Sequence, residues 1–470
     1  MLESDALSWS FMAWLASSGA EISAKIQLAD LKEKHAGRGV VALQDVQEEE
    51  FLFRIPRSLI LSVENSDLPS KIPSAFADLD PWLSLILVML YELEKGKESK
   101  WHAYFDILPK EFNTLMFWEP DELAQLQASA VVGKIGKEEA DKGFEERLLP
   151  IIAEYKEVLG IDFPDNEANK AVMLKQMHKL ASTIMAYAFD IEPTDARKEV
   201  DEEGYMSEEE DEALPKGMVP LADMLNADAD RNNARLFYEE NSLSMKALKS
   251  IKAGEEIFND YGPLPRSDLL RRYGYITDNY AKYDVAEIPF YTASAVMEKA
   301  GVLAEDLKSK FEYLESQGVV EDGYTISTSS PFDIQESIAP ELIIMIEALL
   351  LPDHEFDRIA DREKLPKPDK ISIKGAQLLI EIITTHMKDY TTTLEEDIAE
   401  KTVVPLTSSD VSRERRYMMA KLVRIGEKKI LRDAVEALDR LIEHLVVQNK
   451  VGKKPGHDSA GPPKKRQRVE

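Results

Sequence analysis

Hydrophobic and polar positions follow two different patterns along the 470 residues of this chain. Around residues 40–55, and again over 214–274, short apolar runs are separated by Gly, Pro and charged turn residues, which predicts β-structure. Over 81–93, most of 121–190 and the region after about 289, apolar residues recur three and four positions apart, which predicts helices. We therefore predict an α+β protein, in which a β-rich fold is interrupted by a helical insertion and followed by an all-helical domain.

Several individual elements can be predicted from the same patterns. Val40–Leu43 and Phe51–Ile55 look like paired strands, and residues 8–18 like an amphipathic helix. Residues 411–446 predict one long helix, with apolar positions at Met418, Leu422, Ile425, Leu431, Val435, Leu438, Ile442 and Leu445. Such a stripe is typical of the core face of a helical bundle, and a coiled-coil seam is the alternative.

Composition narrows the class of protein. The chain has no cysteine, which excludes disulfides, cysteine–zinc clusters and cysteine nucleophiles, and its seven histidines show no close HxxxH spacing. We therefore expect no metal site. No run of about 18 apolar residues occurs, so no membrane span is expected.

Charge is distributed unevenly along the chain. The net charge is −29, yet the residues from Lys450 onward carry +5, which leaves −34 for the rest. A surface this acidic repels phosphate backbones and attracts basic proteins, so we expect a basic protein partner and no direct nucleic-acid partner. The alternative is that the acidity only keeps the protein soluble.

Two polar segments are not expected to join a core. Residues 199–212 hold nine acids and predict a flexible loop, in which Ser207 precedes five acids in a row, as in an acid-directed kinase site. The C-terminal tail contains Lys464, Lys465, Arg466 and Arg468, a cluster typical of a nuclear import signal. We predict binding to a nuclear import receptor and a nuclear, partly cytoplasmic location; nucleic-acid binding or simple solvation are the alternatives.

The most informative stretch runs from Met218 to Tyr275. An apolar run there ends in Asp223 and Asn226, and two Tyr-Gly pairs follow, the first at Tyr261 and the second at Tyr273. Polar side chains within an apolar run are costly to bury unless they find partners. Taken singly, these residues are also typical of turns, caps and packed core, but together they indicate a site that binds a polar group.

This set of motifs resembles the SET-domain protein lysine methyltransferases. Gly37-Arg38-Gly39, the segment VPLADMLNADADRNNARL around Asp223 and Asn226, and GEEIFNDYG (254–262) occur in that order, with the helical insertion after the first. The resemblance is strongest to the zinc-free subgroup that includes the plant Rubisco methyltransferase and the fungal ribosomal-protein lysine methyltransferases. It covers about residues 8–445 and implies S-adenosylmethionine as cofactor.

The resemblance also implies roles for individual residues. The cofactor-binding positions would be Ala36, Arg38, Gly39, Ala186, Tyr187, Asp223, Asn226, Ala227 and Tyr261. Tyr261 would be the catalytic residue at the methyl-transfer centre, and Tyr273 and Tyr275 would form the channel for the substrate lysine. Many SET proteins have histidine where this chain has Ala227, which removes one side-chain contact to the cofactor.

The implied substrate is a lysine of a large-subunit ribosomal protein, the one numbered forty-two, and a crowded channel favours monomethylation. A histone or transcription regulator is an alternative substrate, and a non-catalytic binding module for a basic protein is an alternative function. The implied organisation has six segments, at residues 1–75 (start of SET), 76–195 (helical insertion), 196–215 (acidic loop), 216–288 (rest of SET, with the active site), 289–448 (helical substrate-binding domain) and 449–470 (basic tail).

Overall fold

The computed structural model describes residues 3–31, 37–163, 166–191, 214–302, 308–400 and 413–451. Contacts divide the chain into two units, Met1–Asp284 with Leu394–Gly426, and Val285–Thr393 with Glu427–Glu470. Each unit is described by itself. The six segments predicted from the sequence stay a prediction.

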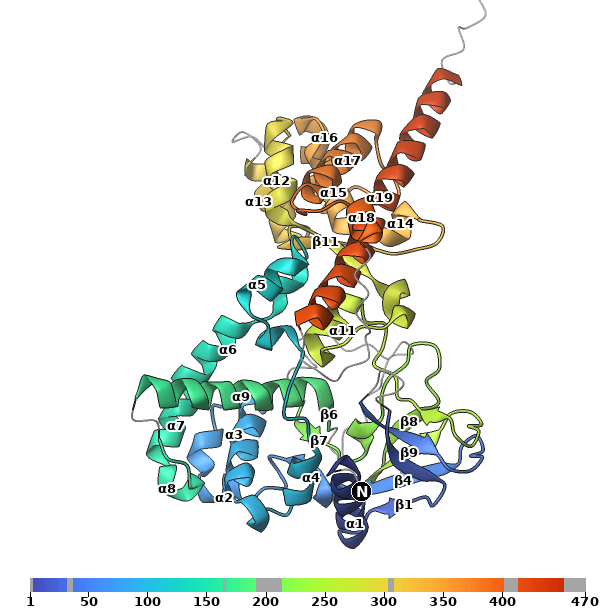
Figure 1. Cartoon of the computed structure of the whole chain (residues 1–470). Coiled ribbons are helices and arrows are strands. Elements are labelled where there is room, and N and C mark those ends of the chain that lie inside the picture. The colour runs from blue at the N-terminus through green and yellow to red at the C-terminus, as the bar shows by residue number, and fades with distance from the viewer. Residues whose placement is uncertain are drawn as a thin grey trace, which may run out of the picture. The chain divides into compact units, whose positions relative to one another are not determined.

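Within the described residues, the strands of the first unit form three small antiparallel sheets. Figure 1 labels β1, β4, β8 and β9 of one sheet and β6 and β7 of another. One has the strand order β1 (Glu21–Ile22), β4 (Phe51–Pro56), β9 (Ser242–Ala247) and β8 (Ala234–Tyr238). The second has the order β10 (Glu256–Ile257), β3 (Arg38–Ala42) and β2 (Ile26–Asp30). The third has the order β5 (Leu61–Ser62), β7 (Lys216–Met218) and β6 (Ala188–Asp190).

The predicted pairing of the strands near residues 40 and 51 is wrong. β3 pairs with β2 and β10, whereas β4 pairs with β1 and β9, so the two strands belong to different sheets. Both strands are largely buried, and each has neighbours on both sides. Since β9 and β10 lie some 190 to 220 residues later in the chain, a local pattern cannot reveal them as partners.

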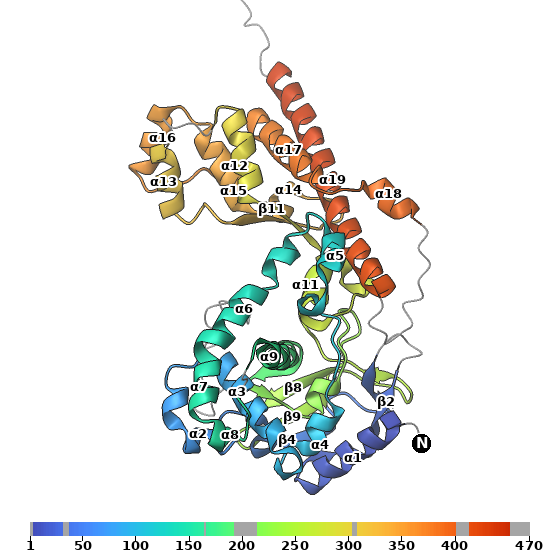
Figure 2. The same ribbon diagram turned by 60° about the vertical axis from the view of Figure 1, so that its left-hand side comes forward.

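Helices complete the first unit. They are α1 (Glu3–Ser17), α2 (Leu68–Lys71), α3 (Pro81–Glu94), α4 (His102–Ile107), α5 (Pro120–Leu123), α6 (Lys137–Gly143), α7 (Leu149–Glu154), α8 (Lys156–Leu159), α9 (Glu167–Tyr187), α11 (Arg266–Tyr273) and α18 (Leu394–Ala399). The predicted helix over 81–93 is confirmed as α3, which begins where the Asp80 carboxylate accepts a hydrogen bond from the Leu83 amide. α9 packs against α3 and is seen end-on in Figure 2. Its last turn delivers Ala186 and Tyr187 to the site described below.

The second unit is mainly helical. A two-stranded antiparallel sheet joins β11 (Val285–Pro289) to β12 (Gly323–Ser327). The helices are α12 (Phe290–Lys299), α13 (Lys308–Ser316), α14 (Ile334–Ser337), α15 (Pro340–Leu349), α16 (Asp353–Ala360) and α17 (Ile373–Met387). α17 packs against both α12 and α15, as Figure 2 shows, so the predicted helical character after residue 289 is confirmed.

The long C-terminal helix α19 (Arg413–Val451) is also confirmed, but most of its predicted buried stripe is wrong. Leu431 and Leu438 are buried, whereas the other six positions are only partly buried: Met418, Leu422, Ile425, Val435, Ile442 and Leu445. In the first half of the helix the buried face instead holds Arg416, Met419, Ala420, Val423, Arg424 and Glu427. The spacing of apolar residues does not reveal this face, because it includes charged residues. Arg416 and Arg424 are buried against the carboxylates of Glu122 and Asp397. No helix within the described ranges combines the length and the apolar character needed to cross a membrane.

Candidate active site

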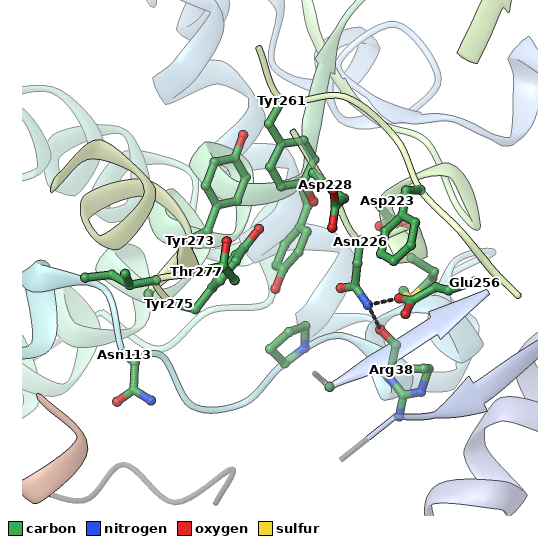
Figure 3. Close-up of a pocket in the computed structure, with 18 of the residues that line it drawn as sticks. Arg38, Asn113, Asp223, Asn226, Asp228, Glu256, Tyr261, Tyr273, Tyr275 and Thr277 are labelled. Atoms are coloured by element: carbon green, nitrogen blue, oxygen red, sulfur yellow. Dashed lines mark hydrogen bonds between the residues drawn. The ribbon is translucent and has the colours of Figure 1, made fainter. Parts of the chain in front are cut away.

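A cavity of about 1470 Å³ in the first unit collects most of the predicted site residues. Its walls include Arg38 at the start of β3 and the segment around Asn226, both labelled in Figure 3. Tyr187, at the end of α9, also lines the cavity. The loop after α4, from Leu108 to Asn113, and residues Arg415, Met419 and Leu422 of α19 complete the lining. Segments separated by up to almost 400 residues therefore meet at one cavity.

Asn226 is fixed at the centre of this cavity by hydrogen bonds on both sides. Its side-chain nitrogen donates to the Arg38 carbonyl (3.3 Å) and to the Glu256 carboxylate (2.8 Å), as Figure 3 shows. Its backbone carbonyl accepts from the Asn259 amide (2.9 Å), next to a parallel bridge between Ala227 and Asn259. The two motifs found in the sequence thus lie side by side, and each holds the other in place.

Gly39 explains why glycine is needed in the first motif. A Cβ atom at this position would lie 2.6 Å from the Leu31 side chain, 2.8 Å from Glu256 Oε1 and 2.9 Å from Asn226 Nδ2. Real Cβ atoms do not approach other atoms so closely. Glycine therefore lets β3 pass directly beside the Asn226–Glu256 pair. Gly39 supports the cavity wall, although it is not among the residues that line it.

A group of tyrosines forms another part of the wall. The rings of Tyr261 and Tyr273 stack with centroids 4.2 Å apart, and the Tyr275 ring lies 6.3 Å from that of Tyr273. The Tyr261 hydroxyl donates a long hydrogen bond to the Leu225 carbonyl (3.4 Å). Burial raises the pKa of Tyr273 to about 12 and the pKa values of Tyr261 and Tyr275 well above their usual range. All three side chains are therefore neutral hydroxyls at physiological pH.

The second Tyr-Gly pair places two of these rings. Gly274 ends α11 in the left-handed conformation (φ +73°), and a Cβ there would lie 2.8 Å from backbone atoms of Asn113 and Thr114. Glycine is needed because it adopts the left-handed conformation without strain and because it has no Cβ atom to clash with the neighbouring backbone. The turn that it forms lets Tyr273 and Tyr275 lie on either side of it and still face the same cavity.

Asp223 is the most unusual polar group of the site. It lies in a single turn of 3-10 helix, Ala222–Met224, that follows Leu221 with φ +74°. The Tyr104 hydroxyl donates a hydrogen bond to Asp223 Oδ2, and the buried carboxylate also interacts with the backbone amides of Leu221 and Asp223. Burial raises the pKa of Asp223 to about 7, although the Tyr104 hydrogen bond and nearby backbone amides oppose this rise.

A second cavity of about 200 Å³ adjoins the first. Residues that line it include Ala186, Ala188, Phe189, Asn259 and Asp260. Four residues, Tyr187, Asp223, Tyr261 and Tyr273, line both cavities. We call these four residues the shared wall.

The structure brings together most of the residues singled out from the sequence. Arg38, Tyr187, Asp223, Asn226, Ala227, Tyr261, Tyr273 and Tyr275 line the large cavity, and Ala186 lines only the small one. Ala36 and the basic cluster Lys464, Lys465, Arg466 and Arg468 lie outside the described residues, as does Ser207. Within the described ranges, no group of three His, Asp or Glu side chains is arranged to hold a metal ion.

Two polar residues of the site were missed. Glu256 lies within the quoted motif GEEIFNDYG, and its strand position beside Ile257 is a signal that sequence reasoning could have used. Tyr104 lies in the segment HAYFDIL, where a buried tyrosine has no signal that separates it from ordinary core. Its importance depends on Asp223, 119 residues later.

Comparison with known proteins agrees with this geometry. The SET domain family matches residues 37–262, and the Rubisco LSMT substrate-binding family matches residues 303–431. Ribosomal lysine N-methyltransferase 4 of Saccharomyces cerevisiae is 35% identical over 362 residues, which cover 73% of this chain and 71% of the yeast protein. This chain belongs to the SET-domain protein lysine methyltransferases.

Other relatives of this SET-domain methyltransferase extend over nearly its whole length. N-lysine methyltransferase SETD6 of Rattus norvegicus is 30% identical, with 92% of this chain and 90% of the rat protein covered. Among solved structures, Rubisco LSMT bound to AdoMet has a TM-score of 0.66 at 21% identity, with coverage of 96% and 97%. The predictions of the family, the α+β SET fold, the protein-lysine N-methyltransferase activity and the S-adenosylmethionine cofactor are confirmed.

Proposed function

We propose that this SET-domain methyltransferase adds one methyl group to a lysine of a large-subunit ribosomal protein, the one numbered forty-two. The observation that carries this proposal is the 35% identity to a yeast enzyme named for ribosomal lysine methylation, over 73% of this chain. The charge of −34 on the chain before Lys450 supports it, because free ribosomal proteins are basic.

The large cavity fits the cofactor. Its volume is ample for a ligand of drug size, and it presents a backbone carbonyl at Arg38, a fixed amide at Asn226 and a carboxylate at Glu256. When bound, S-adenosylmethionine supplies a methyl group on a positively charged sulfur. We propose that Arg38 and Asn226, with Ala36, Tyr187 and Ala227, hold the cofactor, while Gly39 and Asp223 shape the backbone around it. The fixed polar groups around Asn226 support this role, since polar groups orient a ligand in its pocket.

We propose that the substrate lysine enters through the small cavity, beside Ala186, and reaches the shared wall. A lysine ammonium must lose a proton before its nitrogen can react, which costs roughly 4–5 kcal/mol at pH 7 for an unperturbed lysine. Desolvation among tyrosine rings next to a cationic sulfur lowers this cost. The Tyr261 hydroxyl, with Tyr273 and Tyr275 around it, would then align the amine with the methyl group. The small size of the cavity, about 200 Å³, favours a single methylation.

Location and further partners belong to the same proposal. We propose that an import receptor binds Lys464, Lys465, Arg466 and Arg468, so that the enzyme is nuclear as well as cytoplasmic. A fluorescent fusion in which these four residues are changed to Ala should shift from the nucleus to the cytoplasm. An unchanged distribution would contradict the import role.

A histone or a transcription regulator is the second candidate substrate. The similarity to SETD6 of Rattus norvegicus, over 92% of this chain, favours keeping it, because the name N-lysine methyltransferase specifies lysine but no ribosomal target. The non-catalytic binding module is set aside, since the family is one of enzymes.

The test is transfer of a labelled methyl group from S-adenosylmethionine to purified large-subunit ribosomal proteins and, separately, to histones. Tyr261→Phe serves as the inactive variant, and Tyr291→Phe, which changes an exposed tyrosine of the second unit, serves as the matched control. Label on one ribosomal protein that is lost only in Tyr261→Phe supports the proposal. Label on histones alone would favour the second candidate, and mass spectrometry of the product decides the degree of methylation.

A further inference from the structure

The large cavity extends beyond the group around Asn226. In Figure 3, Asn113 lies on one side of the cavity, whereas Arg38 and Glu256 lie on the other, next to Asn226. The faint red helix near Asn113 is α19, which reaches Asn113 through Arg416. The cavity volume of about 1470 Å³ exceeds the roughly 300–1,000 Å³ typical of small-ligand pockets, so there is room for a ligand that reaches from one side to the other.

The side near Asn113 contains a group of apolar residues. The walls there are formed by five residues that we call the far side: Phe112, Asn113, Ile276, Met419 and Leu422. Ile276 packs against the core cluster that contains Met419, so the two segments meet there. Leu422 is only partly buried, although the apolar spacing along α19 predicts a core position, and the cavity is the space that it faces. An apolar wall with few polar groups suits a flat aromatic base.

Asn113 is the polar residue of the far side, and three contacts fix it. Its Oδ1 accepts a hydrogen bond from Arg416 Nε (3.4 Å), and its backbone carbonyl accepts one from Trp118 Nε1 (2.8 Å). Its backbone lies so close to the turn at Gly274 that a Cβ there would approach within 2.8 Å. Arg416 is itself buried and paired with Glu122. A side-chain amide held in this way can bind a ligand in one defined orientation.

We propose that the far side binds the adenosine of S-adenosylmethionine, and that Asn113 binds its adenine base. This inference rests on the proposed function, which places the cofactor at Arg38 and Asn226 and the methyl transfer at Tyr261. The Arg38 carbonyl and the Glu256 carboxylate are acceptors, which suit the ammonium group of the amino-acid part. Adenosine is attached on the other side of the sulfur, so it extends away from Glu256, and the far side offers it apolar contact.

An asparagine side chain is complementary to adenine. Adenine presents an amino group, which donates, beside a ring nitrogen, which accepts, and an asparagine amide can bond to both at once. Asn113 Oδ1 accepts from the amino group and keeps Arg416 on its second lone pair, while Nδ2 donates to the ring nitrogen. Hypoxanthine has a carbonyl in place of the amino group, so Oδ1 would face a second acceptor. Arg416 is therefore a positioning residue, because its hydrogen bond decides which end of the amide is the acceptor.

The first test compares two ligands that differ only in the base. S-adenosylhomocysteine and S-inosylhomocysteine are titrated calorimetrically into the full chain, without a protein substrate. The wild type should bind the adenosine compound at least about tenfold more tightly, and Asn113→Ala should lose most of this difference. Asn241→Ala changes an exposed asparagine that lines neither cavity, and it should behave as the wild type.

The possible failures of this test can be told apart. Equal binding of both ligands by the wild type, or an unchanged ratio in Asn113→Ala, would overturn the inference alone. If the wild type bound neither ligand, the cofactor site of the proposed function would fail with it. The choice of protein substrate does not affect these results, because none is present.

A second pair of variants tests the apolar wall. Leu422 lines the cavity, whereas Met418, one turn earlier on α19 and also only partly buried, does not. Leu422→Trp fills the far side with a ring and should weaken S-adenosylhomocysteine binding at least about tenfold, whereas Met418→Trp should leave it within about twofold. Thermal unfolding shows whether each variant is folded. If folded Leu422→Trp bound the ligand as the wild type does, the adenosine would lie elsewhere and the inference would fail.

The role of Arg416 has its own readout. Arg416→Lys keeps a positive charge beside Glu122 but has no Nε–H group to donate to Asn113. The amide can then turn over, so the preference for adenosine over inosine should fall even where the protein is as stable as the wild type. An unchanged preference in folded Arg416→Lys would show that Arg416 does not orient the amide.

Discussion

Two regions of the first unit bury charged or polar side chains, and they do so in opposite ways. On α19, Arg424 and Asp397 are both almost completely buried and form an ion pair at 3.0 Å, and Arg416 is paired with Glu122 in the same manner. At the shared wall, the Asp223 carboxylate is buried beside neutral groups, the Tyr104 hydroxyl and the backbone amides of Leu221 and Asp223. The paired charges hold segments together, whereas burial next to neutral groups raises the pKa of Asp223 to about 7.

The largest effect is expected from breaking a pair on α19. Arg424→Met leaves the Asp397 charge buried without compensation, which should lower the free energy of unfolding by about 3–5 kcal/mol. Chemical denaturation followed by tryptophan fluorescence measures this. Arg440→Met is the control, because Arg440 is 64% exposed and its ion pair with Glu436 is worth little.

Restoring neutrality should reverse much of this loss. The double variant Arg424→Met/Asp397→Leu replaces the pair by apolar groups and should recover stability relative to Arg424→Met. If the single variant unfolded at the same denaturant concentration as the wild type, the buried pair would not act as a structural anchor, and the contrast with Asp223 would fail.

A substitution in the shared wall should lower enzymatic activity and hardly change the free energy of unfolding. Tyr261→Phe removes a hydroxyl whose hydrogen bond to Leu225 is long, so we expect an unchanged unfolding midpoint and a kcat lower by about a hundredfold. Calorimetry should find S-adenosylmethionine binding within about twofold of the wild type. Full activity in this variant would remove Tyr261 from the methyl-transfer centre.

Cofactor affinity should depend on the space beside Gly39. In Gly39→Ala the new methyl group must displace Asn226 or Glu256, and we expect S-adenosylmethionine to bind about tenfold more weakly, or about 1.4 kcal/mol. Gly37→Ala is a close control, because a Cβ at Gly37 meets no atom within 4 Å. Equal affinities for the two variants, measured by calorimetry, would show that the Asn226 amide does not bind the cofactor.

The smallest effect concerns exposed charge. Since the substrate is proposed to be basic and the enzyme is acidic, kcat/KM should fall severalfold between 20 and 150 mM salt. Buried groups such as Asp223 are screened little, so kcat should change less than KM. A flat response would show that charge does not guide this substrate.

The residues singled out from the sequence mostly line one cavity, whereas the packing around them was predicted less well. Asn226, Tyr261 and Tyr273 could be singled out because they occur together, in the order that the family resemblance requires. The strands that pair with β3 and β4 could not be predicted from the sequence. Their partners β10 and β9 lie some 190 to 220 residues later in the chain, beyond the reach of a local pattern. On α19, Arg416 and Arg424 look like surface residues until Glu122 and Asp397 are placed opposite them.

Helix α19 is shared between the two units, and this limits how the catalytic unit can be cut out of the chain. Residues up to Gly426 belong to the first unit and the following ones to the second. Met419, Ala420 and Val423 pack into one cluster with Trp118, Leu126 and Leu270. A fragment that ended at Asp284 would contain nearly every active-site residue, yet it would expose this cluster to water and leave Glu122 without its cation. The catalytic unit is therefore not a continuous piece of sequence, and a recombination event that exchanged residues after 284 would have to bring a matching helix with it.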